Sequence, residues 1–210
     1  TGVKEAASYQ IVNGITNVNV TLSPHDAVFI VFHDEATVSD MTYPKKTNSL
    51  LLTLQAPWQV KFQANRGAPA EVTFNQLVSY TDNNNEGIKY FSGAATYLNR
   101  FKLTRKQLKN DVRIILNLGE VHNLAEVTVN GRNLGVVWKT PFRIDMTDAV
   151  KKGDNNIEVK VVNLWPNRLI GDLQPGVKEK ITYTAMPFYQ SDSPLQKAGL
   201  LGPVKIFSEK

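Results

Sequence analysis

The segment Ala125-Glu-Val-Thr-Val-Asn-Gly-Arg-Asn-Leu-Gly135 carries the clearest structural signal of the chain. Apolar and polar residues alternate up to Val129, which is the pattern of a strand with one buried face. The dipeptide Asn130-Gly131 then favours a type I′ turn, because both central residues of that turn need positive φ. The segment therefore predicts a β-hairpin, in which Gly135 is expected to allow a close approach of the backbone.

The same two-residue period recurs on both sides of this hairpin. Turn residues separate the runs at intervals of roughly 8 to 12 residues, which is typical of a sandwich or barrel rather than a βαβ fold. Thr73 with Gln76, and Thr104 with Gln107, fit helix capping boxes, but each predicts only a turn or two of helix. We therefore predict an all-β chain folded as a β-sandwich. The alternating runs begin at Leu50, Trp58, Val72, Val112, Phe142, Ile157 and Val204.

The N-terminal region is expected to form a segment of its own. Val18–Phe32 contains an alternating run, the turn residues Ser23–Asp26 and a continuous apolar run, and this order predicts a β-hairpin. The composition shifts near residues 36–48, which indicates a boundary. We therefore predict an N-terminal hairpin segment over residues 1–45 and a main sandwich domain over residues 46–210.

Composition limits the classes of function. The chain contains no cysteine, which excludes disulfides, thiolate metal sites and a cysteine nucleophile. No apolar run approaches the 18 residues of a membrane-spanning helix, so we expect no membrane partner. The formal charge of +5 raises the possibility of nucleic acid as a partner. We expect none, because the densest basic cluster has the spacing of a solvated face; it comprises Lys102, Arg105, Lys106 and Lys109.

Further residues extend the hairpin into a family pattern. After Gly135 come Trp138, Pro141-Phe142, Asp145, Thr147, Lys152-Gly153, Asn156 and Val159–Asn163. The whole pattern resembles the sugar-binding domain of glycoside hydrolase family 2, which is a galactose-binding-like jelly roll. Three other stretches make residues 50–207 most similar to the C-terminal jelly roll of large bacterial α-L-rhamnosidases of glycoside hydrolase family 106. These stretches are Gly87–Gly93, Asn163–Asp172 and Gly199–Val204.

This resemblance implies a setting for the chain. It implies a catalytic domain upstream in the same polypeptide, a carbohydrate partner, and a periplasmic or extracellular location in a bacterium. The segment over residues 1–45 would then be the end of a preceding β-domain. Galactose-binding-like jelly rolls often hold a structural calcium ion, and a site built from loop carbonyls leaves no side-chain trace. No ligands can be assigned from the sequence, and no other cofactor is expected.

Catalysis within this chain has little support from the sequence. Hydrolysis of a glycosidic bond normally needs two carboxyl groups about 5 to 10 Å apart. Carboxylates are plentiful, but nothing pairs them, and adjacent Asp34 and Glu35 are expected to point in different directions. His25, His33 and His122 lack the spacing of metal ligands. A complete (β/α)₈ barrel of about 250 residues cannot fit. We therefore predict no catalytic residue here.

One short segment combines the residue types that recognise sugars. An aromatic face covers the C–H surface of a sugar ring, and planar polar groups pair with its hydroxyls. Pro166 and Gly171 indicate that the segment is a loop. In the alternative reading Trp165 packs in the core and an intra-loop ion pair merely stiffens the loop; Trp58 and Trp138 are expected in the core in either case. The predicted carbohydrate-binding residues are Trp165, Asn167, Arg168 and Asp172.

Three functions stay open at this point. The first is a non-catalytic module of a larger, α-L-rhamnosidase-like glycoside hydrolase acting on complex polysaccharide, which binds carbohydrate or supports the active site. The second is a purely structural β-sandwich without a ligand. The third is a self-contained hydrolase or lyase, which would require two facing carboxylates in one cleft.

Overall fold

The structure, a computed structural model, describes residues 4–109 and 111–210. The chain forms two compact units, and the division falls between Thr47 and Asn48. The first unit contains a three-stranded antiparallel sheet in the order β2-β1-β3. Its strands are β1 (Tyr9–Val12), β2 (Ile15–Val18) and β3 (Asp40–Met41).

The N-terminal hairpin lies earlier in the chain than predicted. Asn13 and Gly14 join β1 to β2 with φ values of 51° and 76°, so the Asn-Gly signal of the main hairpin also operates here. The prediction of a hairpin over Val18–Phe32 is wrong. Ser23 and Asp26 do close a turn, with 3.0 Å from the Asp26 amide to the Ser23 carbonyl. The apolar run Ala27–Phe32, however, forms no strand in the described structure, and Phe29 is 95% exposed.

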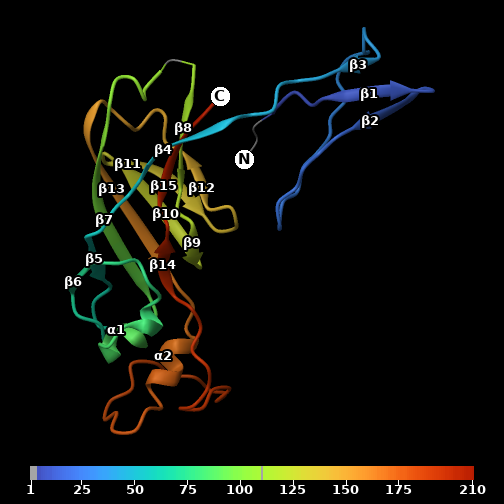
Figure 1. Ribbon diagram of the computed structural model, residues 1–210. Coiled ribbons are helices and arrows are strands. Elements are labelled where there is room, and N and C mark those ends of the chain that lie inside the picture. Colours follow the sequence, from blue (N-terminus) through green and yellow to red (C-terminus); the bar gives the residue numbers. More distant parts are fainter. Residues whose placement is uncertain (1–3, 110) are drawn as a thin grey trace. The chain divides into compact units, whose positions relative to one another are not determined.

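The second unit is an antiparallel β-sandwich (Figure 1). One sheet has six strands in the order β11 (Arg132–Val137), β10 (Leu124–Val129), β13 (Gly153–Val162), β7 (Ala94–Leu103), β5 (Trp58–Phe62) and β6 (Glu71–Phe74). The other has four, in the order β12 (Arg143–Asp145), β8 (Arg113–Asn117), β15 (Lys205–Glu209) and β4 (Asn48–Thr53). A two-stranded sheet pairs β14 (Gly199–Gly202) with β9 (Glu120–His122). This architecture confirms the predicted all-β, jelly-roll β-sandwich.

The core lies between the sheets and follows the two-residue period. Along β5, Trp58, Val60 and Phe62 are buried while the residues between them are exposed, because successive side chains of a strand point to opposite faces. Trp138 was expected in the core but is 61% exposed. Trp138 directly follows edge strand β11 and lies two residues after exposed Val136. Because side chains alternate between the two faces of a strand, Trp138 lies on the same outer face as Val136.

The central hairpin is confirmed at Asn130 and Gly131, which have φ values of 51° and 80°. Gly135 has a different role from the one predicted, since a Cβ built there would meet no heavy atom within 4 Å. Its φ of +103° instead serves the bulge where the register of β10 and β11 shifts between Val127 and Thr128. Glycine at this position therefore satisfies backbone conformation rather than close packing.

Helices are short and lie at one end of the sandwich (Figure 1). They are the 3₁₀ helix η1 (Tyr80–Asp82), α1 (Glu86–Lys89) and α2 (Pro166–Gly171). The side chain of Asn85 caps α1 by accepting a hydrogen bond from the Ile88 amide at 3.3 Å. The loop predicted around residues 165–172 is helical instead, since Pro166 occupies the first turn of α2, where a missing N–H costs nothing.

Neither predicted capping box starts a helix. Thr73 lies in β6, and its hydroxyl donates to the Gln59 side chain across the strand pair at 3.1 Å. Thr104 and Gln107 do make the side-chain contact of a capping box, with 2.8 Å from the Thr104 amide to Gln107 Oε1. Residues 104–107 nevertheless form only a turn. No helix among the described residues is long and apolar enough to cross a membrane.

Candidate functional site

A groove at the helical end of the sandwich is the main candidate site. It has a volume of about 400 Å³, which lies within the range of small-ligand pockets. Three segments form it: the β5–β6 loop, helix α2 with the residue before it, and the long connection from α2 to β14. We call it the α2 groove; its lining residues are Arg66, Trp165, Leu169, Ile181, Thr182, Tyr183 and Thr184.

Two aromatic side chains and one cation dominate the α2 groove. Trp165 is 45% exposed and Tyr183 is 89% exposed. The guanidinium carbon of Arg66 lies 4.8 Å from the centroid of the Trp165 ring, which is a cation–π contact. Arg66 therefore covers one face of the indole. The exposed aromatic surface of the groove comes from the remainder of Trp165 and from Tyr183.

A buried ion pair within α2 supports the wall of the α2 groove. Arg168 Nη2 lies 3.1 Å from Asp172 Oδ1, and both side chains are more than 90% buried. The other carboxylate oxygen of Asp172 accepts hydrogen bonds from the Ile181 amide at 3.1 Å, the Thr182 amide at 2.7 Å and the Thr182 hydroxyl. Asp172 therefore ties helix α2 to the two wall residues Ile181 and Thr182.

The environment of Asp172 favours its ionised form. Burial raises the pKa of this carboxyl, but hydrogen bonds from Thr182 and Ile181, together with the charge of Arg168, more than offset burial. The net pKa is lowered from 3.8. Arg168 Nε is buried without a hydrogen-bond partner among the described residues, so the charge of Arg168 depends on Asp172 for compensation.

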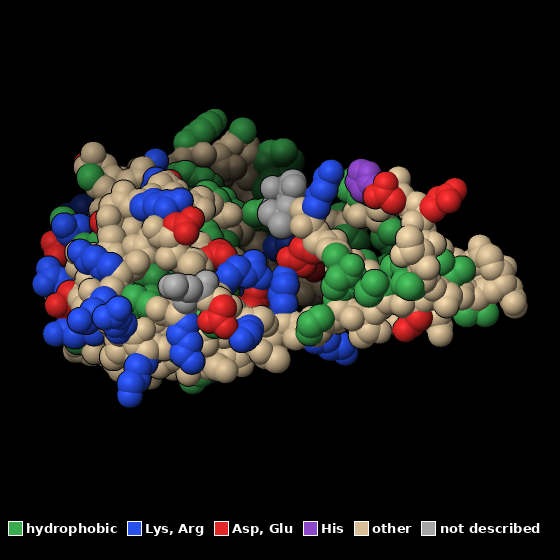
Figure 2. All heavy atoms as spheres, turned by 90° about the horizontal axis from the view of Figure 1, so that it is seen from above, with side chains coloured by type: hydrophobic (Ala, Val, Ile, Leu, Met, Phe, Trp, Pro, Cys, Tyr) green, Lys and Arg blue, Asp and Glu red, His purple; other side chains and the backbone are tan. Residues whose placement is uncertain are grey.

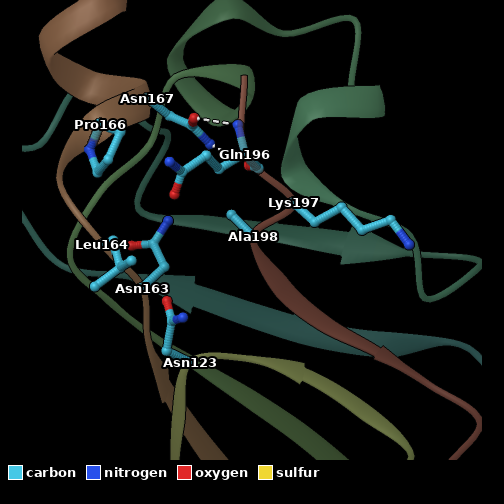
Figure 3. A pocket seen from close by; sticks show the side chains of 8 residues that line it. All are labelled: Asn123, Asn163, Leu164, Pro166, Asn167, Gln196, Lys197 and Ala198. Carbon is cyan, nitrogen blue, oxygen red and sulfur yellow. Dashed lines mark hydrogen bonds between the residues drawn. The ribbon is translucent and has the colours of Figure 1, made fainter. Parts of the chain in front are cut away.

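Asn167 binds the C-terminal end of the connection from α2 to β14 through Gln196. Only 2% of it is exposed; its Nδ2 donates to the Gln196 carbonyl at 2.6 Å and its Oδ1 accepts from the Gln196 amide at 2.8 Å. Figure 3 shows this pair beside a small polar cavity near Asn123 and Asn163. The cavity measures about 10 Å³, which suits a single water molecule rather than a sugar.

The structure thus gathers the four predicted binding residues around α2 in different roles. Trp165 reaches the α2 groove, while Asn167, Arg168 and Asp172 are buried, Asn167 bonding to Gln196 and Arg168 pairing with Asp172. The expected ion pair of the alternative reading is present, but Trp165 is not in the core. The role of these residues in carbohydrate binding stays a prediction.

Sequence reasoning missed Arg66 and Tyr183. Arg66 lies about a hundred positions before Trp165 in the turn Asn65-Arg-Gly67, so no local pattern connects the two side chains. Tyr183 stands between two threonines in a polar stretch with no strand period. An aromatic flanked by hydroxyl residues in a long connection was the one signal that could have drawn attention to it.

Two carboxylates outside the α2 groove, Glu209 and Glu120, are held by basic side chains. Glu209, 8% exposed, contacts Arg113 and also Arg143, the latter at 3.3 Å. Hydrogen bonds from His122 and then Lys197, each at 2.9 Å, lower the pKa of Glu120. No group of three or more His, Cys, Asp or Glu side chains in the described ranges could hold a metal ion. A calcium site made of backbone carbonyls stays a prediction.

The antiparallel jelly roll of the second unit is the fold of galactose-binding-like domains. The chain belongs to the glycosyl hydrolase 2 galactose-binding domain-like family, whose family model matches residues 73–184. It is therefore a galactose-binding-like domain of a glycoside hydrolase.

Similar proteins are much longer than this chain. The structure of the rhamnosidase from Novosphingobium sp. PP1Y shares 44% sequence identity and superposes with a TM-score of 0.90, over 97% of this chain and 19% of that chain. A protein named "Putative beta-glucuronidase" from Formosa agariphila is 40% identical over 178 residues, 74% of this chain and 15% of its own length. A β-D-glucuronidase from Dictyoglomus thermophilum, at 20% identity and a TM-score of 0.53 over 80% of this chain and 29% of that one, shares the fold.

Proposed function

We propose that this domain is a non-catalytic module that contacts carbohydrate for a larger glycoside hydrolase acting on complex polysaccharide. The observation that carries the proposal is the α2 groove, where exposed aromatic surface of Trp165 and Tyr183 lies beside Thr182 and Thr184. Apolar ring surface next to hydroxyl and amide groups is the combination that sugars require. The groove either binds a glycan directly or forms a wall of the active site.

We further propose a rhamnosidase-like parent protein with its catalytic domain upstream. Support comes from the 44% identity to the Novosphingobium rhamnosidase over 97% of this chain, which is only 19% of that protein. Exposed apolar side chains on the connection from α2 to β14, namely Val177, Met186 and Phe188, suit contact with the remainder of such a polypeptide. A polysaccharide substrate favours a periplasmic or extracellular location.

The first unit fits the same arrangement as the end of a preceding β-domain. Figure 2 shows hydrophobic side chains gathered on its surface, with charged residues beside them. Val28 to Phe32 are all more than 45% exposed, although a continuous apolar run is typical of a strand covered on both faces. We propose that the rest of the parent protein covers this run.

The proposal predicts that Trp165→Ala weakens carbohydrate binding about tenfold or more. Rhamnose-, galactose- and glucuronate-containing oligosaccharides should bind the 210-residue chain at millimolar concentrations, as followed by chemical-shift changes of the backbone amides. Removing the indole takes away aromatic contact area and the ring on which Arg66 stacks. The free energy of unfolding should change little, because Trp165 is 45% exposed. Trp138→Ala is the matched control, since Trp138 is exposed and lies outside the α2 groove.

A structural module without a ligand is the second candidate. It is favoured by the internal use of Asn167, Arg168 and Asp172, whose polar atoms fasten the chain rather than face the groove. Absence of any shift from the whole oligosaccharide panel at millimolar concentration would select this alternative and reject direct carbohydrate binding.

A further inference from the structure

We propose that the α2 groove selects a sugar residue that carries a carboxylate, and that Arg66 is the group that pairs with this carboxylate. The proposal rests on the carbohydrate-contacting function of the same groove. A guanidinium offers two parallel N–H donors that match the geometry of a carboxylate.

Arg66 is held in place before any ligand arrives. Its guanidinium stacks on Trp165 at 4.8 Å from the ring centroid. The loop that carries it is closed by a hydrogen bond from the Phe62 amide to the Ala70 carbonyl at 3.0 Å. Neighbouring Gly67 packs so closely that a Cβ there would lie 2.8 Å from Ile181 Cδ1, a wall atom of the α2 groove. Because the side chain is already ordered, less conformational entropy is lost when a ligand pairs with it.

The donors of Arg66 are not used within the described protein. Its one recorded contact is the Trp165 ring, and the described residues give it no hydrogen bond or ion pair. Asp172, behind the groove wall, does not pair with Arg66. One of its oxygens contacts Arg168, and the other accepts hydrogen bonds from Ile181 and Thr182. A half-buried guanidinium without an anion favours an anionic ligand over a neutral one.

The rest of the groove is compatible with a negative charge. No Asp or Glu is among the groups that line it in the described structure, so an incoming carboxylate meets no like charge. Exposed Lys178, Glu179 and Lys180 precede Ile181 in the chain and together add one net positive charge next to this wall residue. Trp165 and Leu169 supply apolar surface for the C–H face of the sugar ring. The groove thus combines a sugar-type surface with one fixed cation.

The test compares four ligands that share one ring. Methyl β-D-glucuronide carries the carboxylate, its methyl ester and methyl β-D-glucoside are neutral, and the 6-sulfate of the glucoside carries a different anion. Each is titrated into the 210-residue chain and followed by chemical-shift changes, with Arg66→Met, Arg66→Lys and Arg105→Met as variants. Met keeps the length and apolar stem of Arg, while exposed Arg105 provides the same change of net charge outside the groove.

The glucuronide should bind about tenfold or more tightly than its ester and the glucoside, a difference of about 1.4 kcal/mol. Arg66→Met should abolish this preference, Arg66→Lys should keep part of it, and Arg105→Met should leave it unchanged. Equal binding of glucuronide and glucoside would overturn the carboxylate assignment while the carbohydrate-contacting function stands. Tighter binding of the 6-sulfate would likewise overturn it. No binding of any of the four ligands at millimolar concentration, together with none of the oligosaccharide panel, would reject both proposals.

Discussion

Replacing Asp172 with alanine is expected to lower the free energy of unfolding by about 3 to 5 kcal/mol, because it leaves the buried charge of Arg168 without a counterion. Arg168 is 6% exposed, and its Nε already lacks a hydrogen-bond partner in the described structure. The same change releases the Ile181 and Thr182 donors that Asp172 holds. The loss therefore combines an unpaired cation with a loosened groove wall.

Urea denaturation of the 210-residue chain and its variants measures this loss, with the slope against urea concentration expected to stay constant. Asp172→Asn keeps the shape and one acceptor but removes the charge, so it should cost less than alanine. The double variant Arg168→Met with Asp172→Ala should recover part of the loss, because no buried charge is then left unpaired. Asp154→Ala is the control, since the Lys102–Asp154 pair is more than 70% exposed and contributes at most a few tenths of a kcal/mol. A cost for Asp172→Ala no larger than that of this control would contradict the role assigned to the buried pair.

The pH dependence of this contribution follows from the lowered pKa of Asp172. A carboxyl with a folded-state pKa below its unfolded value contributes stability that is complete above the unfolded pKa, here near 3.8. That contribution is lost as the pH falls through the folded-state value. The stability difference between the parent chain and Asp172→Asn should therefore be constant near neutral pH and shrink below pH of about 4.

The β-sandwich could be predicted because the patterns that specify its strands and turns lie within short stretches of sequence. Alternation along β5, β10 and β13 identifies the buried face directly, and Asn130-Gly131 specifies its turn through the φ values that both residues must adopt. The N-terminal hairpin was misplaced because the apolar run over Ala27–Phe32 outweighed the equally specific turn signal at Asn13-Gly14. An apolar run indicates side chains suited to burial, but it does not determine whether the segment forms a strand.

The candidate site could be predicted only in part, because its geometry is long-range. Trp165 was found since its neighbours in the sequence have polar groups suited to sugars. Whether those groups face a ligand or each other depends on partners such as Gln196 and Thr182, which the fold brings to α2 from far along the chain. Arg66 arrives from the opposite end of the domain sequence. The short motif therefore located the site. It could not show which residues face the groove, as Trp165 does, and which are buried behind it, as Arg168 and Asp172 are.

Asn155→Ala is expected to lower the free energy of unfolding by about 2 to 4 kcal/mol, since it removes four hydrogen bonds worth about 0.5 to 1.5 kcal/mol each. Asn155 is 1% exposed. Its Oδ1 accepts from Asn130 Nδ2 and the Lys151 amide, and its Nδ2 donates to the Lys151 and Gly153 carbonyls, at distances of 2.8 to 2.9 Å. The side chain therefore connects the turn before β13 to the Asn130 turn of the central hairpin.

Asn156→Ala is the matched control for this prediction, because Asn156 is the next residue of β13 and faces solvent. Its side chain makes no hydrogen bond to any residue that the structure describes, while its backbone amide donates to Asn130 Oδ1 at 3.0 Å. Asn156→Ala should change stability by no more than about 0.5 kcal/mol. In Asn155→Ala the Asn130 side chain loses one of the two acceptors of its Nδ2 and keeps the other, the Ala149 carbonyl at 2.8 Å. Because Asn130 is then held less firmly, the Asn156 amide should also exchange with deuterium faster than in the parent chain. Equal stability of the two variants, with unchanged exchange at Asn156, would contradict the role assigned to the Asn155 side chain.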